Sequence, residues 1–159
     1  MLGSLVYHLV TFCMPLETDL AAILCSLLLN GQAEVRHDYV AAGEARHVRV
    51  DCETASHVIE VGFDGKRSSY DSIHQAVFAA SLTGKLPMVV LIDTDGREEA
   101  VQYQVRTVAR HLGITALTVN QAFLVRWQMT APFRSGASVP LFGLDPRLTD
   151  VANAARPPS

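Results

Sequence analysis

Asp51 and Glu60 are the two residues of this sequence whose spacing best suggests chemistry. The residues around them alternate between apolar and polar, as in strands with one buried face. If residues 55 and 56 form a two-residue turn, Asp51 lies directly opposite Glu60 in an antiparallel hairpin. The apolar side chains of the hairpin then collect on the opposite face: Val50, Cys52, Ile59 and Val61.

This opposition of two carboxylates has a chemical consequence. Directly paired residues have Cβ atoms about 4.5 to 5.5 Å apart, where like charges are destabilising unless something compensates them. Mg²⁺ or Mn²⁺ would compensate, since these ions bind carboxylate oxygens, water and substrate phosphates. The pattern therefore predicts a metal site at Asp51 and Glu60. Two alternatives remain open: the pair lies at a solvated sheet edge, or Arg49 and His47 neutralise it.

The surrounding sequence predicts the elements that position this hairpin. Runs of β-branched residues indicate strands, and apolar residues at helical spacing, closed by glycine, indicate helices. In chain order we expect a helix over 18–30, strands at 35–40, 48–52 and 59–63, a helix over 68–83, a strand at 88–92, a helix over 101–112 and a strand at 115–119. The unbroken apolar run 88–92 suits a strand covered on both faces, which we place at the sheet's centre.

Several short blocks between Glu34 and Ile92 resemble, in the same order, a bacterial group within the PD-(D/E)XK (restriction-endonuclease-like) nuclease superfamily. The blocks are R-V-D-C at 49–52, V-I-E-V at 58–61, Lys66, I-H-Q-A-V-F-A-A at 73–80 and T-G-K-L-P at 83–87. The resemblance implies an α/β fold with that superfamily's αβββαβ core, in which helices flank a mixed central sheet. It also implies metal-dependent hydrolysis of phosphodiester bonds.

The resemblance also implies roles for individual residues. Asp51 and Glu60 would bind Mg²⁺ or Mn²⁺, and the catalytic residues would be Asp51, Glu60, Lys66 and Gln75, with Glu17 or Glu34 as an additional acid. The departure is Gly62, where the superfamily's usual pattern has lysine and the resembling group has aspartate. Lys66 lies four residues further on and could reach back from the start of the next helix. The alternative function is a catalytically inactive binding or assembly module of the same fold.

Charge limits the partners that the chain would attract. Thirteen Lys and Arg against 16 Asp and Glu give a formal net charge of -3. Long-range attraction to a polyanion is therefore not expected, and contact with nucleic acid would need a local basic patch. Arg46, Arg67 and Lys85 are candidates for that patch. Trp127 is expected to pack in the core with Phe123, Leu124 and Val125, whereas an exposed aromatic group there would instead suit a homodimer contact.

Length and cysteine content bound the organisation of the chain. We expect one domain over residues 1–131, with 1–14 as an N-terminal extension or core strand, and an irregular Pro/Gly-rich tail over 132–159. Stretch 2–15 lacks a basic n-region and is too short to span a membrane, so an export signal is less favoured. The three cysteines have neither C-x-x-C nor zinc-ligand spacing and are expected to be reduced, which favours the cytoplasm: Cys13, Cys25 and Cys52.

A second acidic stretch begins at Asp93 and reads D-T-D-G, like the start of a calcium loop. Arg97 stands at the third ligand position, and Gln104 stands where the closing glutamate belongs. The sequence therefore disfavours calcium. It predicts instead that Asp95 caps the following helix.

Overall fold

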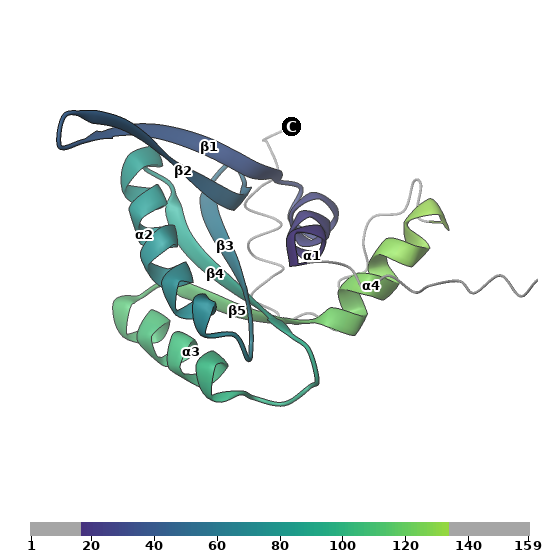
Figure 1. Cartoon of the computed structure of the whole chain (residues 1–159). Coiled ribbons are helices and arrows are strands. Elements are labelled where there is room, and N and C mark those ends of the chain that lie inside the picture. The colour runs from purple at the N-terminus through teal and green to yellow at the C-terminus, as the bar shows by residue number, and fades with distance from the viewer. Residues whose placement is uncertain (1–16, 134–159) are drawn as a thin grey trace, which may run out of the picture.

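A five-stranded mixed sheet organises the computed structural model, which describes residues 17–133 (Figure 1). The strand order is β1-β2-β3-β4-β5; the first three strands are antiparallel and the last three parallel. The strands are β1 (Gln32–Ala41), β2 (Glu44–Glu53), β3 (His57–Phe63), β4 (Leu86–Asp93) and β5 (Thr115–Asn120). This is the expected α/β class, with a mixed sheet flanked by helices.

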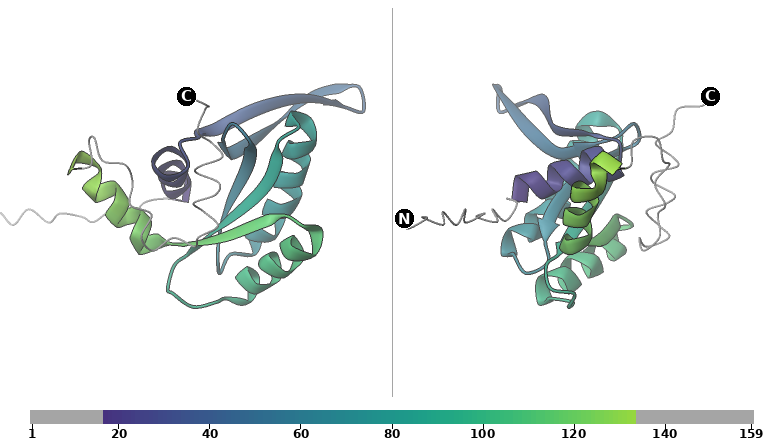
Figure 2. Two further views of the ribbon diagram at one scale, coloured as in Figure 1. Left: turned by 180° about the vertical axis from the view of Figure 1, so that it is seen from behind. Right: turned by 90° about the vertical axis from the view of Figure 1, so that its right-hand side faces the viewer.

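Helices cover both faces of the sheet (Figures 1 and 2). One face carries α1 (Glu17–Ile23), the π-helical turn η1 (Leu24–Leu28) and α4 (Gln121–Thr130), which a short turn η3 (Ala131–Phe133) follows. The other face carries η2 (Arg67–Tyr70), α2 (Asp71–Thr83) and α3 (Ala100–Leu112). Every helix and strand predicted between residues 18 and 119 is confirmed within a few residues, whereas α4 was not predicted as a helix. The extension or core strand expected over 1–14 lies outside the described residues, as does the expected tail beyond Phe133.

The core follows from the apolar runs of β3 and β4. All seven residues of β3 are buried, and five consecutive residues of β4, Met88–Ile92, are fully buried. Alternate side chains of β4 enter opposite clusters: Met88, Val90 and Ile92 pack towards α1 and α4, whereas Val89 and Leu91 pack towards α2 and α3. The prediction of a doubly covered strand is confirmed. The middle strand of the sheet, however, is β3, because β1 and β2 add to its other side.

Local signals account for the helix ends. Gly84 and Gly113 close α2 and α3 in the left-handed conformation, with φ of 71° and 70°, as glycine at such positions allows. The prediction that Asp95 caps α3 is wrong, because a reciprocal capping box of Glu99 and Gln102 begins that helix. Asn120 caps α4 by accepting hydrogen bonds from two backbone N–H groups.

The β1–β2 hairpin leaves the body of the sheet as a two-stranded arm. Paired residues of β2 and β3 are only Cys52 with Ile59 and Glu53 with Val58 within the described chain. The β1–β2 ladder skips the position of Glu34 and Asp51, and Glu34 has a φ of 56°. Beyond this irregularity the hairpin extends over the end of α2 (Figure 1).

The prediction of reduced cysteines is wrong for two of the three. Cys25 in η1 and Cys52 in β2 form a disulfide, with their Cα atoms 5.4 Å apart. The two residues are 27 positions apart, so only the packing of η1 against β2 brings them together. Local spacing carries no signal for such a pair, and the cysteines no longer support a reducing compartment. Cys13 lies outside the described residues.

Within residues 17–133, no helix combines the length and the apolar character needed to cross a membrane.

Candidate active site

The turn at residues 55 and 56 gives the register that the sequence predicted. Cys52 pairs with Ile59 and Glu53 with Val58, and one step further along the hairpin brings Asp51 beside Glu60. The Asp51 and Glu60 side chains lie close enough for the charge of Asp51 and hydrogen bonding with it to raise the pKa of Glu60. The Asp51 carboxylate also accepts a hydrogen bond of 2.8 Å from the Val61 backbone N–H. The two acids therefore converge on one face of the sheet.

Glu60 is the more perturbed acid of this pair. Only 2% of the residue is exposed, and this burial raises the pKa of its carboxyl group to about 9, helped by the charge of Asp51, the hydrogen bond to Asp51 and the charge of Glu34. Its Oε1 atom is buried and has no hydrogen-bond partner among the described residues. A buried carboxyl oxygen without a partner is costly, so this atom is where a ligand would be most stabilising.

Three of the four apolar side chains of the hairpin lie on the predicted face of the sheet. Cys52, Ile59 and Val61 share the cluster beneath α1 and α4. Val50 was predicted on that face but packs with Val58 and Ala79 on the α2 side. The interruption of the ladder at Glu34 and Asp51 lies between Val50 and Cys52, and it breaks the alternation that the prediction assumed.

A polar cavity of about 230 Å³ opens beside Asp51. Its wall is formed by β2, β3 and the start of the helix pair η2–α2, and the lining residues are Asp51, Val61, Gly62, Ser68, Ser69, Asp71, Ser72 and Gln75. Gln75 therefore lies at the same cavity as Asp51, as the resemblance implied. Ser68, Ser69 and Ser72 were not predicted at this site, because their place depends on how the start of α2 packs against β3.

Position 62, at the wall of this cavity, has no room for a side chain. A Cβ atom at position 62 would lie 2.5 Å from the Ser69 Oγ and 2.8 Å from the Ser69 Cβ. Ser69 is buried, and its hydroxyl donates a hydrogen bond of 2.7 Å to the Phe63 carbonyl oxygen. Ser69 thus occupies the space that a lysine or aspartate at position 62 would need.

Lys66 is not among the residues that line this cavity. Its Nζ lies 4.7 Å from the centroid of the Phe63 ring, in a cation–π arrangement. Phe63 belongs to the apolar cluster beneath α1 and α4, on the face of the sheet opposite Gly62. The structure therefore places Asp51 beside Glu60 and at one cavity with Gln75, whereas neither Glu60 nor Lys66 is among the residues that line that cavity.

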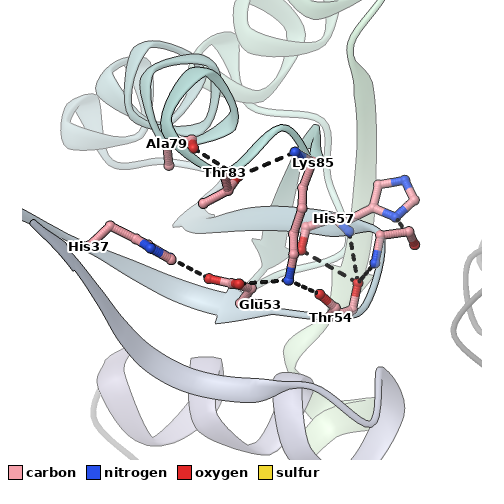
Figure 3. Close-up of polar contacts among 8 residues, drawn as sticks. His37, Glu53, Thr54, His57, Ala79, Thr83 and Lys85 are labelled. Atoms are coloured by element: carbon pink, nitrogen blue, oxygen red, sulfur yellow. Dashed lines mark hydrogen bonds and ion pairs between the residues drawn. The ribbon is translucent and has the colours of Figure 1, made fainter. Parts of the chain in front are cut away.

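A charged network fixes the end of β2 next to the carboxylate pair (Figure 3). The Lys85 ammonium donates hydrogen bonds of 2.6 Å to both Glu53 Oε1 and the Thr54 carbonyl oxygen, and His37 bonds the other Glu53 oxygen. Burial alone would raise the pKa of Glu53, but hydrogen bonds and charges from Lys85 and His37 outweigh it and lower this pKa. The Lys85 ammonium is therefore engaged in contacts within the protein and does not face outward as a basic patch would require.

Other charged residues lie near the Asp51–Glu60 pair. The Arg49 guanidinium lies 3.2 Å from Glu34 Oε2, so Arg49 forms an ion pair with Glu34, a third acidic residue. Glu34 acts electrostatically on Glu60, which is consistent with the additional acid that the resemblance implied. The side chain of Glu17, the other candidate, is outside the described part of the structure.

Asp64, Asp93 and Asp95 form a second acidic group, with ligand atoms within 4.8 Å of one another. The oxygens of Asp64 already accept hydrogen bonds from Thr94 and Gly65, and Asp93 accepts from the backbone of the following turn. These bonds explain the group as a turn that joins the ends of β3 and β4.

Comparisons with protein-family models, curated proteins and solved structures found no match to this chain.

Proposed function

We propose that this chain is a divalent-metal-dependent phosphodiesterase with a restriction-endonuclease-like core. Three features support the proposal. The order α1, β1, β2, β3, α2, β4 agrees with the αβββαβ core. Asp51 and Glu60 converge from neighbouring strands, and Gln75 lies at the same cavity as Asp51.

One observation carries this proposal: the unpartnered, buried Oε1 of Glu60 beside the carboxylate of Asp51. Hard oxygen donors of this kind fit Mg²⁺ or Mn²⁺. In the absence of a cation, burial next to Asp51 keeps Glu60 protonated at neutral pH. Binding of a divalent cation would therefore displace a proton from Glu60, as metal binding to protonated ligands generally does.

Each residue has a separate task in the proposed reaction. Asp51 and Glu60 would hold a divalent ion, which would supply Lewis-acid polarisation of a phosphodiester and would lower the pKa of the attacking water. Asp51 is oriented by the Val61 N–H, which fixes one carboxylate oxygen. Gln75 presents an amide to the same cavity and would orient water or a phosphate oxygen through hydrogen bonds.

Cleavage of plasmid and single-stranded DNA or RNA with Mn²⁺ tests the proposal. We expect Asp51→Asn and Glu60→Gln each to lower the rate on the order of 100-fold or more, as loss of a positioned catalytic group does. Glu98→Gln is the matched control, because Glu98 is an exposed carboxylate that pairs with Arg106. Cleavage that survives both site substitutions would refute the assignment.

A specific observation favours a second candidate, the catalytically inactive module. Ser69 fills the space next to Gly62, and Lys66 stacks on Phe63, so the described structure places no lysine at the cavity. Thermal unfolding during titration with Mn²⁺ separates the two candidates. An ion that binds the folded state raises the melting temperature with concentration, whereas a flat response favours the inactive module.

A further inference from the structure

An apolar groove lies between α2 and α3, on the face of the sheet opposite α1 and α4 (Figure 1). Its volume is about 590 Å³, against about 230 Å³ for the cavity beside Asp51. Apolar side chains dominate both walls, with Ile73 and Val77 from α2 and Val105 and Val108 from α3. The described part of the chain therefore leaves an apolar hollow between two neighbouring helices.

Large apolar side chains of this groove are exposed to solvent. Val77 is 42% exposed and Val108 is 47% exposed, and both line the groove. Leu112 at the end of α3 and Tyr70 just before α2 are exposed lining residues as well. These four residues and the groove between them form the α2–α3 face. Monomeric soluble proteins rarely expose contiguous apolar patches of more than a few hundred Å², and larger patches mark interaction sites.

The α2–α3 face is suited to contact with a second copy of itself. The lining residues of the groove include no lysine, arginine, aspartate or glutamate. In a two-fold symmetric dimer the same patch of both copies meets, and like charges placed against each other would oppose association. The cores of protein–protein interfaces are likewise depleted in charged residues. A strongly charged partner, by contrast, would find no opposite fixed charge in the groove.

The aromatic group of α4, where the sequence left a dimer contact open, is buried instead. Trp127 packs beside Phe123 in the cluster beneath α1 and α4, so the prediction that it packs in the core is confirmed. The α2–α3 face is on the other side of the sheet. Its groove shares no lining residue with the cavity beside Asp51, so self-association there neither requires nor excludes the proposed function.

We propose that the α2–α3 face is the contact surface of a two-fold symmetric dimer. Each helix has 13 residues and is about 20 Å long, and the pair is roughly 20 Å wide. Two such faces bury on the order of 1,000 Å² in total when they meet, which is about the smallest area of a specific interface. The apolar side chains of one copy fill the groove of the other. A contact of this area predicts a dimer that dissociates on dilution.

Sedimentation velocity of the full chain across the micromolar range tests the dimer. The variant Val77→Glu with Val108→Glu places two charges on the α2–α3 face of each copy, at positions exposed enough to keep the monomer folded. We expect its dissociation constant to rise by about tenfold or more, as changes at the centre of an interface do. Met129→Glu with Phe133→Glu is the matched control, because it adds the same charge at exposed apolar residues of α4 and η3. This control should dimerise like the wild-type chain.

A second variant keeps the test valid if a charge disturbs folding. Val77→Lys with Val108→Lys should also be monomeric by itself. An equal mixture of the Lys and Glu variants should form the dimer again, because opposite charges then meet across the contact. Far-UV circular dichroism and urea unfolding of each variant establish that the monomers are folded.

The dimer is ruled out if the wild-type chain stays monomeric throughout this range, or if the Glu variant associates as tightly as the wild type. It is also ruled out if the control variant loses the dimer to the same extent, or if the mixture of Lys and Glu variants remains monomeric. Cleavage with Mn²⁺ is a separate measurement, so a failure of the proposed function would leave the dimer standing.

Discussion

Glu60 sets the pH dependence expected at the scale of single residues. Its carboxyl has a pKa of about 9 in the folded protein against an ordinary 4.5, so the folded chain keeps a proton that the unfolded chain releases. The stabilising contribution is complete below about 4.5 and is lost as pH rises towards about 9. Glu60→Gln retains a neutral side chain and should remove this decline. Urea unfolding in EDTA between pH 5 and 9 measures it, and an unchanged pH profile would contradict the assignment.

Gly62 gives a second prediction at this scale. Gly62→Ala places a Cβ against Ser69, and overpacking of this kind costs about 1–3 kcal/mol of unfolding free energy. Gly65→Ala is the matched control, because the nearest atom to its added Cβ is Glu99 Cγ at 4.0 Å. Urea denaturation of both variants measures the difference. Equal stability of the two would show that Ser69 yields without cost.

The residues of the candidate site differ in how far sequence could predict them. Alternation along the hairpin was enough to pair Asp51 with Glu60, because strand periodicity is local. The place of Ser69 depends on how η2 packs on β3. The position of Lys66 depends on where the Phe63 ring lies. Both are tertiary relations, and the spacing of Lys66 from Glu60 holds no information about them.

At the scale of elements, Lys85 connects the end of β2 to the turn between α2 and β4. Lys85→Met removes the hydrogen bonds to Glu53 and Thr54 and should cost about 1–3 kcal/mol at pH 7, as hydrogen bonds to charged groups do. Because Lys85 lowers the pKa of Glu53, the wild-type advantage is present at neutral pH and is lost in acid. Urea unfolding at pH 7 and pH 3 checks this, and an equal difference at both would contradict it.

The elements themselves were largely accessible from the sequence. Glycines 84 and 113 and the apolar run of β4 marked boundaries through local backbone preferences. The irregularity at Glu34 was not predictable, because a non-glycine residue with a φ of 56° carries no compositional mark. Helix α4 was missed because its apolar residues, Phe123 to Trp127, form no clear stripe, although Asn120 offered a local N-cap signal.

At the scale of the whole molecule, the Cys25–Cys52 disulfide links η1 covalently to β2. It closes a loop with a sequence separation of 27, which corresponds to about 3–4 kcal/mol in the chain-entropy treatment. Unfolding in urea with and without reductant should show that loss. The variant Cys25→Ala with Cys52→Ala is the control and should not respond to reductant. A wild-type protein equally indifferent would mean that the bond does not stabilise the fold.

This covalent bond also determines what a single backbone cut would do. Ala42 and Gly43 form the exposed tip of the arm, between the two cysteines in the sequence. A protease that nicks the tip separates the chain into two pieces, one with Cys25 and the other with Cys52. On a non-reducing gel the nicked protein should migrate as a single species, and after reduction as two. The arm can therefore be opened at its end while the halves stay tethered, which makes a nicked form accessible for study.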